Sequence, residues 1–265
     1  FMSFIRVVLI LLIFILVTLI LIVLQFLSIL LNIKTKFIPH HYHKFVVKLI
    51  SLRIIKYREC SKNKPLLVVS NHISWLDILV ISSSFEVSFV AKREVKDWPF
   101  FGILAQLQRT VFIERTMKDL IKQKKLMAKR LLDGDSLLLF PEGTSSDGKR
   151  VLPFKSSLFS LAELKGMNKN VTIQPITIAY TGLNGLPAGL NERPLFAWFG
   201  EMSLILHIFN VLMAGPAEAV IIFHEPKTIL DFNSRKDLSE YCEEVISNGL
   251  SKAISGRLND IHLDK

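Results

Sequence analysis

Residues 66–84, with the sequence LLVVSNHISWLDILVISSS, decide the fold of this chain. The apolar run Leu66–Ser70 is typical of a buried strand, whereas Asp77–Ser84 has the apolar spacing of a helix. A polar stretch, Asn71–Ser74, joins the two. A strand that passes through a polar turn into a helix is the building unit of α/β domains, whose ligands bind where the strands end. The stretch therefore predicts an α/β domain with a functional site at this turn.

Strands and helices are predicted to alternate along the rest of the chain after residue 64. Further strands are expected at Val87–Ala91, Thr110–Ile113, Ser136–Phe140, Val171–Ala179, Leu195–Phe199 and Ala219–Phe223. Further helices are expected at Met117–Leu132, Lys155–Leu164 and Arg235–Arg257. This alternation predicts that residues 65–265 form a single domain with a mixed central sheet flanked by helices.

A long apolar segment precedes this domain. Val7–Leu31 holds 25 residues, of which only Thr18, Gln25 and Ser28 are polar. As a helix it reaches roughly 37 Å, more than the hydrocarbon core of about 30 Å. A cleaved signal peptide has a shorter apolar run and ends at a small-residue cleavage site, which does not follow here. The segment predicts a membrane-embedded helix, which either crosses the bilayer or dips into it and returns.

Basic residues follow the apolar segment. Nine lysines and arginines stand against one acid, Glu59, between Asn32 and Lys64, and the whole chain has a net charge of +10. Positive charge beside a membrane helix stays in the cytoplasm and attracts anionic headgroups, so we expect the domain on the cytoplasmic face of a membrane. Because this basic stretch already has membrane lipids as a partner, nucleic acid is not an expected partner.

Within the basic stretch, Pro39–Arg58 carries apolar residues among lysines and predicts an amphipathic helix at the membrane surface. Residues 1–64 are therefore expected to be the membrane-binding part. Three histidines, His40, His41 and His43, have no acidic or cysteine neighbour, which favours headgroup contact over a metal site.

The two cysteines of the chain, Cys60 and Cys242, lie far apart in the sequence and stand in no ligand-type spacing. This pattern argues against a disulfide framework, a zinc site and an iron–sulfur cluster, and it indicates a reducing compartment. No metal is expected.

The turn after Ser70 contains the candidate catalytic pair. His72 lies in the turn and Asp77 in the first turns of the helix, so the carboxylate can reach back to one imidazole nitrogen. The other nitrogen is then left for a substrate proton, which makes the pair a general base. The alternative is structural: Ser74 and Asp77 have the spacing of a helix cap, and His72 is then only a loop residue.

No serine or cysteine stands in a Gly-x-Ser-x-Gly turn, so the pair has no protein nucleophile to activate. A substrate hydroxyl is the expected nucleophile, and it attacks an activated acyl group without a covalent enzyme intermediate. Two other classes stay open, namely a membrane-bound esterase, which needs a protein nucleophile, and a membrane-anchored scaffold or lipid-transfer module.

Three further clusters follow or interrupt predicted strands. Phe112–Arg115 ends in an arginine that can bind phosphate or carboxylate oxygens or, alternatively, form a surface ion pair. Phe140–Gly148, followed by Lys155, has the glycines, hydroxyls and lysine of an anion-binding loop. In Ile173–Ile178, Pro175 interrupts a strand and predicts an edge or a bulge.

The order and spacing of these clusters resemble the glycerolipid acyltransferase family, which includes the lysophosphatidic acid acyltransferases. The resemblance covers Leu66–Tyr180. It implies that His72 is the general base and Asp77 its orienting partner. It also implies acceptor binding by Arg115, Glu142 and Gly143, to which Thr144 and Lys155 add their anion-binding groups. Four more residues match the motifs and are expected to support the site: Asn71, Phe112, Pro141 and Pro175.

The resemblance implies an O-acyltransferase that moves a fatty acyl group from acyl-CoA or acyl-ACP to the free hydroxyl of a lysophospholipid-like acceptor. Lysophosphatidic acid is the expected acceptor, the thioester is a cosubstrate, and no cofactor is expected. Two departures concern the acceptor. Ser145 and Ser146 stand where the family often has arginine, and Gln108–Thr110 stands where it often has glycine. A lyso-ornithine lipid or another lyso-lipid is therefore the alternative acceptor, and the oligomeric state stays open.

Overall fold

The computed structural model describes residues 2–31, 33, 37–113, 117–161, 163 and 171–259. In these residues the strands form one sheet in the order β1-β8-β6-β2-β5-β3-β4, with β7 paired to β6. The strands are β1 (Leu52–Tyr57), β2 (Leu66–Ser70), β3 (Ser88–Lys92), β4 (Val111–Ile113), β5 (Ser136–Leu139), β6 (Thr172–Leu183), β7 (Leu186–Pro187) and β8 (Ala217–Phe223). The α-helices are α1 (Met2–Leu30), α2 (Phe37–Leu49), α3 (Leu76–Ser84), α4 (Phe101–Leu107), α5 (Met117–Leu132), α6 (Leu204–Ala214) and α7 (Arg235–Ile254). Four short 3-10 helices are η1 (Arg93–Asp97), η2 (Ser156–Leu161), η3 (Arg193–Leu195) and η4 (Ile229–Asp231).

The sheet is mixed, as predicted. Strands β6, β2, β5, β3 and β4 run parallel to one another, whereas β8 runs antiparallel to β6 and parallel to β1. The carboxyl ends of the five parallel strands therefore lie along one edge of the sheet, where ligands bind in such folds. The turns that follow β2 and β5 are neighbours at this edge, because the two strands pair directly.

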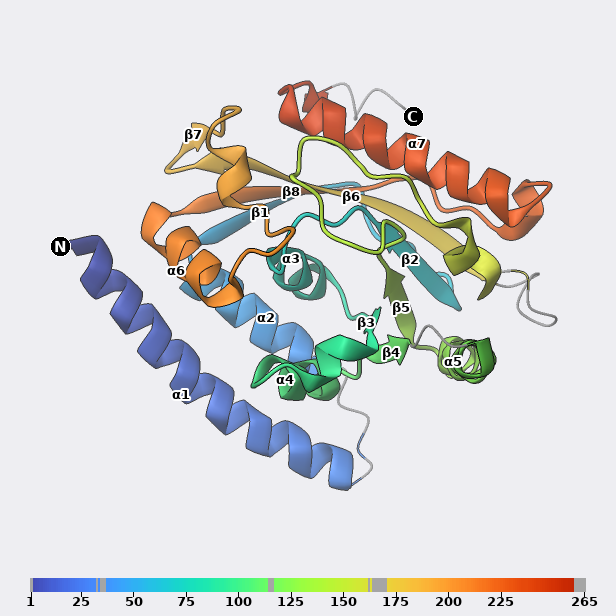
Figure 1. Cartoon of the computed structure of the whole chain (residues 1–265), viewed down its shortest axis with the longest axis horizontal. Coiled ribbons are helices and arrows are strands. Elements are labelled where there is room, and N and C mark those ends of the chain that lie inside the picture. The colour runs from blue at the N-terminus through green and yellow to red at the C-terminus, as the bar shows by residue number, and fades with distance from the viewer. Residues whose placement is uncertain are drawn as a thin grey trace.

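Helices cover both faces of the sheet (Figure 1). On one face, α2 and α3 pack against inward side chains such as Val68 and Ile178. On the other face, α5 and α7 pack against Val69 and Ile173. Successive residues of a strand point to opposite faces, so a strand buried on both faces reads as one continuous apolar run. This explains why the apolar stretch Leu66–Ser70 was recognisable in the sequence as a strand.

The apolar N-terminal segment is helix α1, and it lies along the domain beside α2, α4 and α6 (Figure 1). Phe4–Leu30 is long enough and apolar enough to cross a membrane, with a mean hydropathy of 3.8. Two of its polar side chains contact the domain: Thr18 Oγ1 lies 2.7 Å from Tyr42 Oη, and Gln25 donates to the Leu107 carbonyl at 3.0 Å. The remaining faces of α1 expose large apolar side chains, which supports membrane association.

The predicted amphipathic helix Pro39–Arg58 is wrong in its second half. Helix α2 ends at Leu49, Ser51 adopts a positive φ of 58°, and the chain then forms strand β1. The run Leu52–Tyr57 includes two adjacent β-branched isoleucines, which favour a strand once β8 offers a pairing edge. The sheet therefore includes residues that precede Pro65.

The predicted headgroup contact of the α2 histidines is wrong for His43, whereas His40 is half-buried. His43 is buried, with Nδ1 2.9 Å from Ser82 Oγ, and Nδ1 of His40 lies 2.6 Å from the Ser82 carbonyl. These contacts fasten α2 to α3. Only His41 is exposed, with its Nδ1 bonded to the Phe37 carbonyl in the same helix.

The predicted strand Leu195–Phe199 does not form. The chain makes a 3-10 turn at Arg193–Leu195, and the aromatic ring of Phe196 then stacks on Tyr180 with centroids 5.3 Å apart. Phe196 and Ala197 are fully buried. Apolar residues in this short run therefore reflect burial against the sheet rather than membership of it, an ambiguity that periodicity alone does not resolve.

Candidate active site

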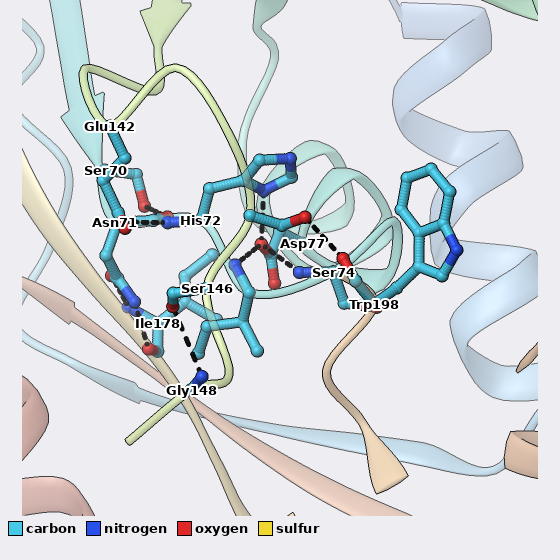
Figure 2. Close-up of polar contacts among 12 residues, drawn as sticks. Ser70, Asn71, His72, Ser74, Asp77, Glu142, Ser146, Gly148, Ile178 and Trp198 are labelled. Carbon is cyan, nitrogen blue, oxygen red and sulfur yellow. Dashed lines mark hydrogen bonds and ion pairs between the residues drawn. The ribbon is translucent and has the colours of Figure 1, made fainter. Parts of the chain in front are cut away.

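The pair His72 and Asp77 forms at the carboxyl end of β2. His72 Nδ1 lies 2.8 Å from Asp77 Oδ2, and the Asp77 carboxylate is fully buried (Figure 2). The same oxygen accepts the backbone N–H groups of Ile73 and Ser74 at 2.7 and 2.9 Å. The interpretation of Asp77 as a helix cap and its interpretation as the partner of His72 are therefore compatible. One carboxylate oxygen orders the backbone of the turn and also holds the imidazole.

The orientation of His72 directs its second ring nitrogen away from Asp77 (Figure 2). An Nδ1–H that donates to Asp77 makes Nε2 the basic atom of the ring, and Figure 2 shows Nε2 directed away from the carboxylate. The imidazole stacks on the ring of Phe140, with centroids 4.0 Å apart and planes 19° from parallel. The His72 side chain is 20% exposed, so a substrate can reach the imidazole. The bond to Asp77 and the stacking on Phe140 hold the ring in place.

Tyr180 is a third member of the group that sequence reasoning missed. Its hydroxyl donates to Asp77 Oδ1 at 2.7 Å, so both carboxylate oxygens of Asp77 are hydrogen-bonded. Burial and the neighbouring Asp77 charge raise the pKa of Tyr180 well above its ordinary value, which keeps the hydroxyl a donor. Tyr180 lies at the end of the apolar run that predicts β6, and nothing in its local sequence distinguishes it from a core aromatic.

Asn71 joins the end of β2 to the neighbouring strand β6. Its Nδ2 donates to the Ile178 carbonyl at 2.9 Å, and its Oδ1 accepts the Ile178 N–H at 2.8 Å. Asn71 is buried, and this pair of bonds extends the contact between β2 and β6 beyond the last residue of β2. It supports the turn and makes no contact that points toward a substrate.

Glu142, expected as an acceptor ligand, is a buried residue that binds the chain itself. Its Oε1 accepts the backbone N–H of His72 at 2.7 Å, and its Oε2 accepts that of Leu152 at 3.0 Å. Burial raises the pKa of Glu142 to about 8, although the two N–H donors act in the opposite direction. Glu142 thus fixes the position of the turn that contains His72, and Pro141 beside it is buried as well.

The loop that follows β5 places a lysine at the surface of the site. Gly143 has a positive φ of 70°, and a Cβ at this position would lie 2.6 Å from Lys155 Nζ. The Lys155 N–H donates to the Pro141 carbonyl at 3.0 Å, which anchors its backbone. Lys155 and Thr144 are both exposed. An ammonium group and a hydroxyl are therefore available to an anionic ligand at this loop.

Ser145 and Ser146 of the loop after β5 bond within the protein. Ser145 Oγ donates to the Trp198 carbonyl, and Oγ of the buried Ser146 accepts the Gly148 N–H at 3.3 Å. The Ser146 N–H donates to the His72 carbonyl at 2.8 Å. The Trp198 N–H in turn donates to the Ile73 carbonyl at 3.0 Å. These bonds join the loop after β5, the turn that contains His72 and the segment before α6 (Figure 2).

The second cluster is described only in part, because Arg115 and Glu114 lie outside the described residues. Phe112 lies in β4 and lines a cavity of about 490 Å³ with four cationic side chains: Arg93, Lys96, Arg109 and Arg130. Asp135 Oδ2 accepts from Arg109 at 3.1 Å and from Arg130 at 2.8 Å. The wall beside the second cluster is therefore positively charged.

Pro175 lies inside β6 and pairs with β2 on one side, but on the other side it stands where the pairing with β8 is irregular, as predicted. The ladder ends at Ile176 with Phe223 and the next bridge, Ile173 with Lys227, is out of register by one residue. A second irregularity lies farther along, at 180–182. The Pro175 carbonyl accepts the His224 N–H at 3.0 Å, just beyond the last ladder pair, Ile176 with Phe223. The proline nitrogen faces this same side, where the regular ladder has ended, so little is lost by its missing hydrogen.

Comparison with known proteins agrees with this geometry. A family model described as acyltransferase matches residues 51–179. The lyso-ornithine lipid O-acyltransferase of Rhizobium meliloti (strain 1021) is 40% identical over 238 residues, which cover 88% of this chain and 82% of that protein. The protein of the same name from Brucella abortus (strain 2308) is 41% identical over 224 residues, covering 83% and 84%. A 1-acyl-sn-glycerol-3-phosphate acyltransferase of Neisseria gonorrhoeae is 41% identical over 97 residues, covering 36% and 38%.

A solved structure has the same fold. The crystal structure of the 1-acyl-sn-glycerophosphate (LPA) acyltransferase from Thermotoga maritima superimposes with a TM-score of 0.64 at 20% sequence identity, covering 94% of this chain and 97% of that one. The mixed sheet with its flanking helices is thereby confirmed as the fold. Because the matched relatives span most of the sequence at about 40% identity, the chain belongs to the acyltransferase family and is an enzyme of that family.

Proposed function

We propose that the enzyme transfers a fatty acyl group from an acyl thioester to the free hydroxyl of a lyso-ornithine lipid, with lysophosphatidic acid as the second candidate acceptor. The relatives that span most of the chain are named for the first activity, whereas the Neisseria relative named for the second matches a shorter part. Ser145 and Ser146 support this order, because serines stand at the two positions where an arginine is expected for an acceptor phosphate, and both are bonded within the protein.

The observation that carries the proposal is the hydrogen bond between His72 and Asp77. In the proposed reaction, His72 Nε2 takes the proton of the acceptor hydroxyl as its oxygen attacks the thioester carbonyl. The buried Asp77 carboxylate stabilises the imidazolium that forms. The carbon–sulfur bond then breaks, and the imidazolium returns the proton to the leaving thiolate. The products are an ester and a free thiol, so the reaction needs no protein nucleophile.

The acceptor headgroup is proposed to bind at the basic residues beside the site. Lys155 at the loop after β5 and Arg115 after β4 are proposed to bind the carboxylate or phosphate of the acceptor. The donor is proposed to be acyl-CoA or acyl-ACP. The basic residues between positions 32 and 64 support a location on the cytoplasmic face, where both thioesters occur.

The test is acyl transfer by the purified enzyme and its His72→Ala variant. Labelled acyl-CoA and acyl-ACP are offered with lyso-ornithine lipid and with lysophosphatidic acid. We expect the wild type to acylate lyso-ornithine lipid faster, and His72→Ala to lose at least about 100-fold in kcat. His41→Ala is the matched control, because His41 is an exposed histidine away from the turn. Retained transfer by His72→Ala overturns the general-base assignment, and labelling by a serine-reactive probe favours the esterase alternative.

A further inference from the structure

Helix α6 has an outward face that is unusual for a helix in contact with water. The fifteen residues from Met202 to Pro216 contain no lysine, arginine, aspartate or glutamate. The side chains of Met202, Ile205, Leu206 and Phe209 are exposed, at 41%, 74%, 64% and 36%. A surface helix of a soluble domain places polar residues on this face. The inward face of α6 is already packed, since Val211, Leu212 and His207 are buried.

The apolar face of α6 continues the apolar face of α1. The two helices lie side by side (Figure 1), and Arg6 Nη2 donates to the Leu212 carbonyl at 3.3 Å. Val7 and Ile10 of α1 share one core cluster with Val211 and Leu212 of α6. Packed helices have axes about 8–10 Å apart, so α6 lies within one helix diameter of α1. Whatever medium surrounds the outer faces of α1 therefore reaches α6.

That medium is lipid for α1, given its length and mean hydropathy of 3.8. We propose that α6 is a second membrane-contacting helix, whose outward side chains Ile205, Leu206 and Phe209 lie in the hydrocarbon of the bilayer beside α1. A second copy of the chain is the other possible occupant. Lipid is favoured because the face of α6 is continuous with that of α1 and contains no charged side chain. The one charged residue of α1, Arg6, is half-buried and bonded to the Leu212 carbonyl of α6.

The same helix is bonded to the catalytic turn. Trp75, which lies between His72 and Asp77 in the sequence, donates from Nε1 to His207 Nδ1 of α6 at 2.9 Å. The segment that leads into α6 also contacts the turn, through the bond from the Trp198 N–H to the Ile73 carbonyl. Lipid contact at α6 would therefore hold the catalytic turn at a fixed place near the membrane, where a lyso-lipid acceptor resides. This step rests on the proposed function, whereas the lipid contact itself does not.

The contact is tested with single labels on the full-length enzyme in vesicles of phosphatidylcholine and phosphatidylglycerol. In a Cys60→Ser background, with Cys242 fully buried, an environment-sensitive fluorophore is attached at Leu206→Cys, Leu16→Cys or Leu230→Cys. The three leucines are matched in exposure, at 64%, 62% and 63%. Leu16 lies in α1, and Leu230 lies in η4 beside the core of the opposite face.

We expect lipids that carry a doxyl quencher in their acyl chains to quench the label at 206 as they quench the label at 16, and to leave the label at 230 unchanged. A label at 206 that behaves like the label at 230 overturns the proposal. A blue-shifted label at 206 that lipid does not quench, and that shifts back when the enzyme is diluted into excess vesicles, overturns it in favour of contact between two copies.

A second measurement links the contact to turnover. We expect Leu206→Glu to lower the rate on an acceptor held in vesicles by about tenfold, a loss comparable with removing one leucine side chain from hydrocarbon. The rate on a short-chain acceptor dispersed in water should be retained, which shows that the variant is folded. Leu230→Glu should leave both rates unchanged. Equal rates for Leu206→Glu and wild type on the vesicle-held acceptor contradict the proposal. The quenching experiment contains no acceptor, so its result does not depend on which lyso-lipid the enzyme acylates.

Discussion

Asp77 receives four hydrogen bonds in a fully buried position, and Tyr180 supplies the only one that reaches Oδ1 from the described residues. A buried carboxylate whose two oxygens both accept hydrogen bonds keeps one orientation. The hydrogen bond from His72 Nδ1 to Asp77 Oδ2 then fixes the orientation of the imidazole. Tyr180 therefore acts on the proposed proton transfer from a distance, as a positioning residue.

The Tyr180→Phe variant tests this role. Phenylalanine keeps the stacking on Phe196 but removes a hydrogen bond to a charged group, which typically contributes about 1.5–3 kcal/mol. We expect kcat to fall roughly tenfold, while the KM for the acceptor stays within about twofold because Tyr180 does not face the ligand. Steady-state kinetics with Tyr241→Phe, a change on α7, give the control. A change confined to KM would contradict the assignment.

Glu142 makes a distinct prediction about pH. Its pKa, raised from 4.5 to about 8 by burial, means that the folded state binds one proton more than the unfolded state between these two values. The contribution of Glu142 to stability therefore falls as pH rises through this window, by about 1.4 kcal/mol per pH unit at most.

The Glu142→Gln side chain cannot ionise, so the variant should lack this pH-dependent contribution to the free energy of unfolding. We expect the variant to be less stable than the wild type at pH 5, because an amide cannot accept both N–H donors, and to approach the wild type as the pH rises to 8. Thermal unfolding in detergent micelles across this range measures the difference. A difference that is independent of pH would contradict a folded-state pKa of about 8 for Glu142.

At the scale of elements, the loop after β5 depends on one glycine for the position of its lysine. Gly143 and Gly134 both have positive φ, at 70° and 83°, but a Cβ at Gly134 meets open space whereas one at Gly143 meets Lys155 Nζ. Alanine at either position costs about 1 kcal/mol in backbone strain. Only Gly143→Ala should displace the ammonium group.

We therefore expect Gly143→Ala to raise the KM for an anionic acceptor several-fold, as Lys155→Ala does, while Gly134→Ala lowers stability without changing KM. Kinetics and thermal unfolding of the three variants measure both effects. Equal KM values for Gly143→Ala and Gly134→Ala would contradict the proposal that Lys155 binds the acceptor.

The elements that the sequence predicted well are those whose pattern is local. The buried strands β2 and β5 and the helices α3, α5 and α7 agree with the expected ranges to within a few residues, because strand and helix periodicities differ and turn residues bound them. Strand β1 was missed, since its partner β8 lies far along the chain and its lysine and arginine resemble an interfacial helix. Helix α6 was missed because it has no polar face to reveal a helical period.

The site was predicted where one turn contains both partners and missed where the contact is made across the fold. His72 and Asp77 are five residues apart, so their bond follows from the turn itself. Tyr180 reaches Asp77 from another strand, and no spacing rule relates them. Glu142 was recognised as important, but burial decides that its oxygens bind backbone N–H groups, and burial cannot be deduced from the motif.

At the scale of the whole molecule, α1 serves as part of the protein's packing as well as its membrane contact. Removing residues 1–31 would uncover apolar side chains of α2 and α6 that share a core cluster with Val7 and Ile10. We expect the shortened protein to aggregate in the absence of detergent, since contiguous apolar patches drive association. Size-exclusion chromatography with light scattering measures this. A monodisperse monomer without detergent would contradict it.

Pairing of β1 with β8 also sets an order of events during biosynthesis. Leu52 pairs with Ala217, so the edge of the sheet cannot close until nearly the whole chain has left the ribosome. At synthesis rates of about 5–20 residues per second, α1 has emerged many seconds before β8 exists. The nascent chain can therefore contact the membrane through α1 before β8 is available to complete the sheet. The last steps of domain folding then take place at the bilayer surface.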